Sequence, residues 1–561
     1  MDHNNVFGDS QYEDVDDILM GDGDEFDIEN QLQPPANANV VNVDFRELPL
    51  IRMEENIKEN VDQVIERIAT LPTLFKRNGL LVQVATVAAD PTSCTDIPTA
   101  RIYDVPAAKL KSIISNACRF EGRDNRDNWV AKKPSPDIAQ AVFHDVEFEG
   151  VRELHGVAEA PLMRLDRSVL STPGYDPETK LLYAPKRAYK QVADRPTLAD
   201  AKKAYELLAK PWADFPTTSA VGRMVPVAAV VTIVCRHAIG GSVPAFVFDA
   251  STPGSGKSIQ ANCVSILATG RYASFTNWPT ENVEVEKVLD SQVLNGSRLI
   301  TFDNIHPGAV FGCAALDAKL TAVDTVSFRI LGQTRTVEVP WRSTIMATGN
   351  NVVLGSDTVR RTIIQRLEPS MEKPEERDRS QYSIPDLTGW CMANHVDAVH
   401  AALTIVRAYH VAGRPLQGTR SWGSFEAWTD TIANALRWVS GLDVLENRAA
   451  VAGEVDEKTV AFRAFLPRWK SFAPNGMTAG AAIKTLYTVD YMRGQATFDG
   501  LDPLREAIET MAPPDRQGQA PHARAFGNAL RAKSGQWVGG LKLAAKPDRN
   551  GIQVWTAVGE G

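Results

Sequence analysis

The chain is poor in cysteine, and this excludes two kinds of stabilising site. Its 561 residues include six cysteines, and no two of them form a Cys-x-x-Cys pair. Zinc ribbons and disulfide frameworks need cysteines at characteristic close spacings, so neither is expected. We interpret all six as reduced packing residues: Cys94, Cys118, Cys235, Cys263, Cys313 and Cys391.

Long apolar runs and an N-terminal targeting pattern are also lacking. The longest aliphatic run, Val225 to Cys235, is shorter than the ~20 residues that cross a bilayer. The N-terminus has no basic region followed by an apolar stretch, which a secretory signal would need. We therefore expect a soluble, cytoplasmic protein without membrane association.

Basic residues are absent from positions 1–45, which carry twelve Asp or Glu. The formal net charge of −9 is therefore concentrated in this segment, and the rest of the chain sums to +3. An acidic segment poor in aromatics is expected to be disordered. It serves either to solubilise the protein, or to mimic the charge of DNA and dock a replication partner.

Residues 240–370 alternate apolar strand candidates with helices, which is typical of an α/β protein with a parallel sheet covered on both faces. Within this region a phosphate-loop pattern follows the strand 244–249 and opens the helix 258–269. Backbone N–H groups of such a loop and of the helix N-terminus can cradle phosphate oxygens. Lys257 would reach the β- and γ-phosphates of ATP, and Ser258 would bind Mg²⁺. The pattern is met except that its first glycine is a serine, in Ser251, Thr252, Pro253, Gly254, Ser255, Gly256, Lys257 and Ser258.

A second strand, 298–302, ends in Asp303, which is placed to hold the magnesium shell. The next residue is Asn304, where many phosphate-loop ATPases have a glutamate that polarises water. An amide can orient water but cannot accept its proton. Hydrolysis is then slow, or is assisted by an acid such as Glu284 or Asp249, or relies on orientation by Asn304 alone.

Two further polar clusters follow along the chain. A third strand, 343–347, leads into Asn350 and Asn351, and an amide there can hold the attacking water near the γ-phosphate. The segment 357–366 then supplies Arg360 and Arg361. An arginine donated across a subunit boundary can neutralise charge in the transition state.

With these elements placed, the chain resembles the AAA+-like superfamily 3 helicases, especially the replicative primase-helicases of phages and integrated mobile elements. The resemblance is best over about 155–440. It is carried by five motifs: 171–177 (Ser-Thr-Pro-Gly-Tyr-Asp-Pro), 252–258, 300–305 (Ile-Thr-Phe-Asp-Asn-Ile), 347–351 (Ala-Thr-Gly-Asn-Asn), and 357–361 together with 366–369.

The resemblance implies a DNA helicase or translocase that works as a homo-oligomeric ring, taken to be a hexamer. Asn350 or Asn351 would be the sensor, and Arg360 or Arg361 the arginine finger. A hairpin over 320–339 would project into the channel and grip single-stranded DNA. Its candidate phosphate contacts are Lys319, Arg329 and Arg335. Primase activity is not expected, because residues 46–150 contain neither a paired acidic motif nor a zinc cluster.

The last segment, 514–561, has seven Lys or Arg against three acids and the order helix, loop, two strands. This is typical of a winged helix, which could contact duplex DNA at an origin or bind a replication partner. The predicted organisation is an acidic tail (1–45), a small α+β domain (46–150), a connector (151–196), an AAA+-like ATPase core (197–385), a helical subdomain (386–470) and a winged-helix-like domain (471–561).

Two rival interpretations remain. The first is an ATP-controlled DNA-binding switch or loader that assembles at an origin without unwinding DNA, and Asn304 in the glutamate position favours it. The second is a protein that uses ATP only as a structural ligand, or an interaction hub organised by the acidic tail.

Overall fold

A computed structural model of the chain describes most of the sequence and divides it into two compact units. The predicted acidic tail and Cys94 lie outside the described residues, and the five other cysteines are buried and free, as predicted. No helix among the described residues has the length and apolar character needed to cross a membrane. The described residues are 48–53, 55–87, 98–145, 147–217, 219–306, 309–330, 336–355, 357–369, 373–448, 457–487, 502–516, 520–535, 537–538, 540–549 and 551–559.

The first unit combines residues up to 68 with residues 107–143. Its strand β1 (Leu50–Arg52) pairs in parallel with β5 (Arg119–Arg123), which pairs antiparallel with β6 (Trp129–Lys132). Three helices complete it: α1 (Ile57–Ala69), α2 (Ala107–Ala117) and α3 (Pro136–Phe143). In α1 the buried Val61, Val64, Ile65 and Ile68 recur at three- and four-residue intervals, as one buried helix face requires.

The prediction of one small domain over 46–150 is wrong. Residues 69–106 belong to the second unit, where β2 (Leu74–Arg77), β3 (Leu80–Val87) and β4 (Thr99–Asp104) form their own antiparallel sheet. The chain therefore leaves the first unit and returns to it. Local periodicity identified the helices and strands, but it cannot show that neighbouring segments belong to different units.

The predicted connector consists of short strands. They are β7 (Gly156–Ala158), β8 (Leu162–Met163), β9 (Val169–Leu170), β10 (Gly174–Asp176) and β11 (Leu181–Tyr183). Arg164, which follows β8, links this strand to β10. Its guanidinium donates two hydrogen bonds to the carboxylate of Asp176, at 3.1 and 2.8 Å. That carboxylate also accepts from the backbone and hydroxyl of Thr179 in the turn before β11.

The second unit is built around a five-stranded parallel sheet in the order β13-β14-β18-β12-β20. All six residues of β12 are buried, because a central parallel strand is covered on both faces. The strand β18 lies between β12 and β14, so its carboxyl end separates theirs. The bounds are β12 (Ala245–Ala250), β13 (Phe275–Asn277), β14 (Leu299–Ile305), β18 (Thr344–Asn350) and β20 (Thr362–Leu367).

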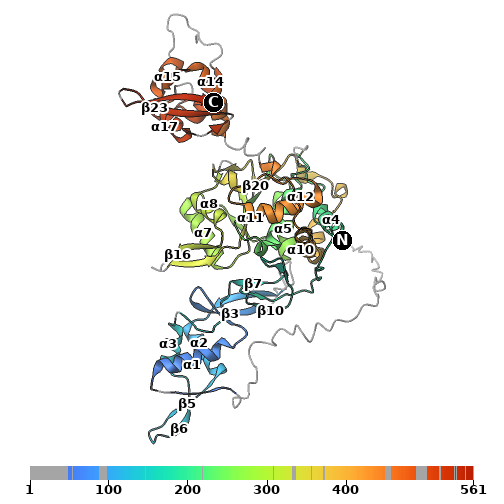
Figure 1. Ribbon diagram of the computed structural model, residues 1–561, viewed down its shortest axis with the longest axis vertical. Helices are drawn as coiled ribbons and strands as arrows, with labels where there is room; N and C mark the ends of the chain where they lie inside the picture. Colours follow the sequence, from blue (N-terminus) through green and yellow to red (C-terminus); the bar gives the residue numbers. More distant parts are fainter. Residues whose placement is uncertain are drawn as a thin grey trace, which may run out of the picture. The chain divides into compact units, whose positions relative to one another are not determined.

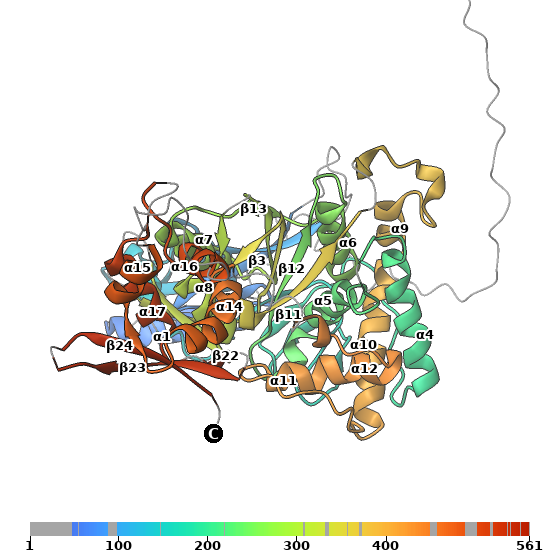
Figure 2. The ribbon, with the colours of Figure 1, turned by 90° about the horizontal axis from the view of Figure 1, so that it is seen from above.

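Helices lie on both sides of this sheet (Figure 2), and a separate hydrophobic cluster lies on each face. On β12, Phe246 and Phe248 enter one cluster, and Ala245 and Val247 enter the other. This alternation follows from the two-residue repeat of a strand. The first cluster holds α4 (Leu198–Ala209), α5 (Met224–Val234), α6 (Lys257–Thr269), α9 (Leu387–Ala393), α10 (His395–Val411) and α12 (Asn434–Ser440), and the second holds α7 (Asn282–Leu294) and α8 (Ala314–Thr321).

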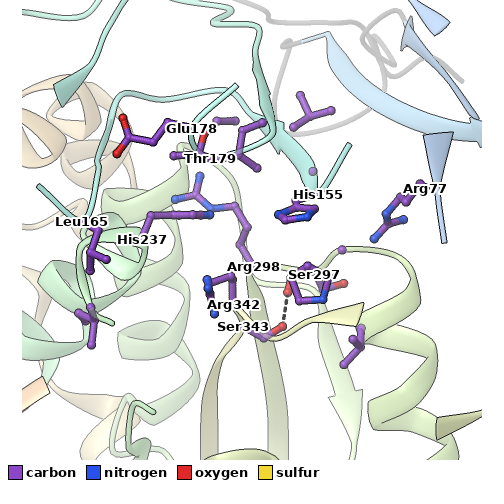
Figure 3. Close-up of a pocket in the computed structure, with 18 of the residues that line it drawn as sticks. Arg77, His155, Leu165, Glu178, Thr179, His237, Ser297, Arg298, Arg342 and Ser343 are labelled. Atoms are coloured by element: carbon purple, nitrogen blue, oxygen red, sulfur yellow. Dashed lines mark hydrogen bonds between the residues drawn. The ribbon is translucent and has the colours of Figure 1, made fainter. Parts of the chain in front are cut away.

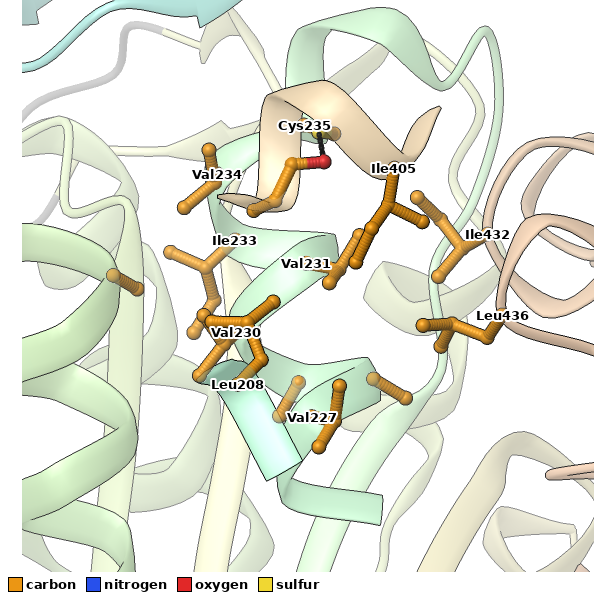
Figure 4. Close-up of a cluster of buried hydrophobic side chains, with 14 of the residues drawn as sticks. Leu208, Val227, Val230, Val231, Ile233, Val234, Cys235, Ile405, Ile432 and Leu436 are labelled. Carbon is orange, nitrogen blue, oxygen red and sulfur yellow. Dashed lines mark hydrogen bonds between the residues drawn. The ribbon is translucent and has the colours of Figure 1, made fainter. Parts of the chain in front are cut away.

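Helix α5 lies in the interior of the first cluster, and all eleven of its residues are buried. Figure 4 shows Val227, Val230 and Val231 among side chains of other helices, including Ile405 of α10 and Leu436 of α12. The prediction of a separate helical subdomain over 386–470 is therefore wrong. Its helices α9, α10 and α12 share one hydrophobic core with α4, α5 and α6.

The predicted hairpin is present, with shorter strands than expected. Strand β16 (Thr325–Arg329) pairs antiparallel with β17 (Thr336–Pro340), and residues 320 and 321 belong to α8 instead. Phe328, Val337 and Val339 anchor one face of the hairpin in the second cluster. The predicted turn and Arg335 lie outside the described residues.

Residues 457–559 form a separate hydrophobic core. Its sheet is antiparallel in the order β21-β24-β23-β22. The predicted boundary at 470 is corrected, because Phe462, Phe465 and Trp469 of α14 pack into this core. Figure 1 labels several of its elements, which are α14 (Glu457–Phe472), β21 (Met477–Thr478), α15 (Ala479–Tyr487), α16 (Asp502–Met511), α17 (Ala523–Lys533), β22 (Trp537–Val538), β23 (Leu541–Pro547) and β24 (Gln553–Gly559).

Candidate functional site

The phosphate-loop pattern forms a loop between β12 and α6, as its place after an apolar strand predicts. Gly254 and Gly256 have φ of 71° and 88°, in the region that favours glycine. A Cβ at Gly254 would also collide with the carboxylate of Glu375. Ser251 is not among the described residues with positive φ, so the backbone there does not require the glycine of the usual pattern.

Lys257 is buried at the first position of α6. Its ammonium donates to Oδ1 of Asn350 at 2.7 Å and to the carbonyl of Thr252 at 3.4 Å. Burial lowers the pKa of Lys257, while the carboxylates of Asp249 and Asp303 act in the opposite direction. These two hydrogen-bond partners are neutral, so the ammonium keeps a capacity to bind a nearby anion.

Asp303 lies on β14 beside the start of α6. Its Oδ1 accepts from the hydroxyl of Ser258 at 2.8 Å and from the hydroxyl of Thr348 at 2.5 Å. The hydroxyl and the carboxylate together offer two hard oxygen atoms, the type of ligand that Mg²⁺ prefers. Thr348 is a site residue that we did not predict from the sequence. Its role depends on β18 lying next to β14, which no local pattern reveals.

Asn304 follows Asp303 at an irregularity where the pairing of β14 with β18 shifts between Phe302 and Ile305. Its φ is 53°, a conformation that asparagine tolerates better than most residues. Its backbone N–H donates to the Thr348 hydroxyl at 3.0 Å, and the residue is exposed. The amide side chain is therefore at the surface of the site.

The two predicted sensor residues have different surroundings. Asn350 contacts Lys257, as described above, whereas Oδ1 of Asn351 accepts from Nη2 of Arg366 at 2.9 Å. The amide nitrogen of Asn351 donates to the carbonyl of Ser251 at 3.4 Å. Asn350 therefore faces the lysine, and Asn351 links the phosphate loop to β20.

Arg366 also forms a buried ion pair that the sequence did not reveal. Its Nη1 lies 2.6 Å from Oδ2 of Asp249, whose side chain is 1% exposed. The other oxygen of Asp249 accepts from the backbone N–H of Val352 at 3.0 Å. Burial raises the pKa of Asp249, and the Val352 hydrogen bond and Arg366 oppose this shift.

These contacts bear on the acids proposed to assist Asn304. Both oxygens of Asp249 are engaged with Arg366 and Val352, which suits a structural role better than proton transfer. Glu284 pairs with Lys287 along α7 at 2.6 Å. Of the alternatives raised by the sequence, orientation of water by Asn304 or slow hydrolysis fits these contacts best.

The two candidate finger arginines also differ. Arg361 is 20% exposed and is held by the backbone carbonyl of Asp357 at 2.8 Å and the carboxylate of Asp317 at 3.4 Å. Arg360 is 71% exposed and pairs with Asp357 one helical turn away. Arg360 is therefore the arginine that another chain could reach, whereas Arg361 fastens the segment to α8.

The two candidate DNA contacts that the structure describes, Lys319 and Arg329, have different surroundings. Lys319 lies on α8, its side chain is 8% exposed, and its ammonium pairs with Asp290 of α7 at 2.7 Å. The ion pair and burial of Lys319 do not fit the predicted contact with DNA: its ammonium is held by Asp290 and lies 6.0 Å from the ring centre of Phe328 on β16. Arg329 is exposed at the end of β16.

Comparisons with known proteins gave structural overlays only. The chain matches no family model and none of the curated proteins searched. The A-form apo structure of the NrS-1 C-terminal region overlays with 11% identity and a TM-score of 0.34, covering 86% of this chain and 96% of that one. SCCmec type IV Cch, described as an active helicase, overlays with 13% identity and a TM-score of 0.33, covering 87% and 98%. At such TM-scores the overlays establish no shared fold, and function is inferred from this chain's own residues.

Proposed function

We propose that this chain is an ATP-driven DNA helicase or translocase that acts in the replication of a phage or mobile element as a ring-shaped oligomer. One observation carries the proposal. The lysine and serine that follow the phosphate loop meet, on neighbouring strand ends, the amide of Asn350 and the carboxylate of Asp303. Four groups suited to binding a nucleoside triphosphate therefore converge near the carboxyl ends of β14 and β18.

The residues fit ATP and Mg²⁺. The backbone of residues 251–256 and the N-terminus of α6 provide N–H donors for the phosphates. Lys257 would supply a positive charge whose direct hydrogen-bond partners are neutral, and Ser258 with Asp303 would supply the oxygen ligands for Mg²⁺. When bound, the metal neutralises charge on the phosphates as the terminal bond breaks. Asn350 holds Lys257 in position from the side of β18.

Transmission of this chemistry to DNA would use two exposed features. The hairpin β16–β17 is anchored in the core by one face and presents Arg329 at the end of β16. Arg360, at the surface, would act on the nucleotide of a neighbouring subunit in a homo-oligomeric ring. The helices and antiparallel sheet of residues 457–559 would form a winged helix that binds duplex DNA or a replication partner.

A switch or loader that does not unwind DNA is the second candidate, and one observation favours it. The residue after Asp303 is an exposed asparagine, and the carboxylate of Asp249 is occupied by Arg366. Without a well-placed general base, slow hydrolysis would suit a timed switch better than a motor.

Strand displacement on a forked duplex separates the two candidates. Wild-type protein is compared with Arg360→Ala and with Lys287→Ala, which removes an exposed lysine paired on α7. The helicase proposal predicts unwinding by wild type and Lys287→Ala and at least a tenfold loss in Arg360→Ala. Partial rescue of Arg360→Ala by an excess of Lys257→Ala subunits, which retain their arginine, would support action between subunits. Nucleotide-dependent DNA binding without unwinding by any form would favour the switch.

A further inference from the structure

A cavity lies at the amino ends of strands β14 and β18. The phosphate loop, by contrast, follows the carboxyl end of β12. The cavity has a volume of about 290 Å³ and is lined by residues that precede β14 and β18, by the turn after α5 and by the connector strands (Figure 3). Arg298 precedes β14, whereas Asp303 lies towards its carboxyl end. A strand of seven residues rises about 20 Å, so the cavity shares no residue with the nucleotide site.

The lining of this cavity is rich in guanidinium groups. Arg77, Arg298 and Arg342 line it, and its one lining carboxylate among the described residues, Glu178, lies 3.6 Å from Arg164. Arg342 forms an ion pair with Asp324, and Arg77 donates to the carbonyl of residue 294 at 2.7 Å. The cavity therefore has an excess of positive charge.

Arg298 is the least compensated of the three arginines. Its guanidinium donates a long hydrogen bond, 3.4 Å, to the carbonyl of Ile233. No carboxylate in the described part of the chain lies within ion-pair distance of it, although a guanidinium has five N–H donors. Burial lowers the pKa of Arg298, and Figure 3 shows its side chain extending into the cavity. Arg298 is half-buried, and Glu159 opposes the shift only from beyond ion-pair distance, so this arrangement suits an anionic ligand.

His237 provides a second, independent indication. Its Nδ1 is buried without a hydrogen-bond partner, and the residue lines the cavity. Burial and the nearby arginines hold the pKa of His237 well below its usual value, so the ring is neutral at pH 7. An unsatisfied buried polar atom costs about 1–3 kcal/mol. His237 therefore places an unsatisfied polar group beside the cavity.

We propose that this cavity binds the phosphate group of a nucleotide-sized ligand, either a free nucleotide or one residue of a DNA strand. Arg298 and Arg342 precede adjacent parallel strands, and both line the cavity, so a phosphate bound there would lie in the field of two guanidinium groups. Arginine binds phosphate through paired N–H donors, which gives directional recognition. The volume is at the lower end of ligand pockets, which favours a single nucleotide unit over a larger ligand.

Calorimetric titration of the full-length chain tests the proposal. All proteins carry Lys257→Ala, so that the phosphate loop contributes little. The probes are deoxythymidine monophosphate, a thymidine oligonucleotide and thymidine, which lacks the phosphate. Arg298→Gln and Arg342→Gln are compared with Arg407→Gln, which removes an arginine paired with Asp194 elsewhere. Each protein is first checked for an unchanged melting temperature.

The expected result is that both cavity variants bind a phosphate-bearing probe at least about tenfold more weakly than the Arg407→Gln control, and that thymidine does not compete. Loss of affinity for the monophosphate would identify a free nucleotide as the ligand, and loss confined to the oligonucleotide would identify the DNA backbone. If Arg298→Gln does not fold, Arg342→Gln decides. Equal affinities in all variants, or no phosphate-dependent binding, would overturn the proposal.

Discussion

Replacing Arg366 by methionine leaves the carboxylate of Asp249 buried with backbone N–H donors, such as that of Val352, but without its ion-pair partner. Removing one partner of a buried ion pair typically costs 3–5 kcal/mol of stability. The Arg366 side chain is 32% exposed, however, so water already screens the interaction. We therefore expect Arg366→Met to lower the free energy of unfolding by about 2 kcal/mol at pH 8.

The cost should depend on pH in a defined direction. Burial already raises the pKa of Asp249, and loss of the guanidinium raises it further because the opposing charge is gone. A carboxyl whose pKa is raised by folding favours the folded state at low pH and loses this advantage as pH rises. The deficit of Arg366→Met relative to wild type should therefore shrink between pH 8 and pH 5.

Urea unfolding followed by tryptophan fluorescence measures this deficit at both pH values. The matched control is Arg407→Met, whose partner Asp194 is 97% exposed, so its cost should stay below about 1 kcal/mol. The double variant Asp249→Asn, Arg366→Met should be more stable at pH 8 than the single arginine variant. A deficit that is the same at pH 5 and pH 8, or no larger than that of Arg407→Met, would refute the reasoning.

Four further outcomes are expected. Thr348→Val removes a hydrogen bond to Asp303. It should raise the Mg²⁺ concentration for half-maximal ATP turnover by about 10- to 100-fold. An unchanged Mg²⁺ titration would contradict a role of Thr348 in orienting Asp303. Lys319→Gln should lower the free energy of unfolding in urea by about 3 kcal/mol, because the carboxylate of its partner Asp290 is left buried. A loss of DNA affinity at unchanged stability would instead support Lys319 as a DNA contact. Arg329→Gln should reduce the salt dependence of single-stranded DNA binding by about 0.7 in the log–log slope, and an unaltered slope would remove it from the interface. Burial lowers the pKa of His395 from 6.5 to about 4. The free energy of unfolding should therefore fall by about 3 kcal/mol as pH falls from 6.5 to 4. In urea titrations, His395→Gln should weaken this pH dependence.

Much of the geometry of the candidate nucleotide site could be predicted because its parts are contiguous in sequence. An apolar strand, a glycine-rich loop and a helix follow one another over 245–269, and the acidic and amide residues stand at the ends of apolar strands. Local pattern therefore found Lys257, Asp303 and Asn350. It could not show which amide meets the lysine, since that depends on β18 lying beside β12.

The errors share one physical cause, which is that they depend on contacts between distant segments. Asp249 and Arg366 are 117 residues apart and meet because β12 and β20 are neighbours. Lys319 resembles a surface lysine beside a hairpin, and only the folded chain brings Asp290 to it. Likewise, the periodicity of α14 shows that it is an amphipathic helix, but not which of two hydrophobic cores it joins.

Steady-state ATP hydrolysis, with and without single-stranded DNA, tests the central proposal most directly. Wild type, Lys257→Ala and the exposed-lysine control Lys287→Ala are measured in the same buffer. The proposal predicts DNA-stimulated turnover by wild type and Lys287→Ala and none above background by Lys257→Ala, whose phosphate-binding charge is gone. Wild-type turnover that stays at the level of Lys257→Ala under both conditions would contradict a motor that hydrolyses ATP at this loop.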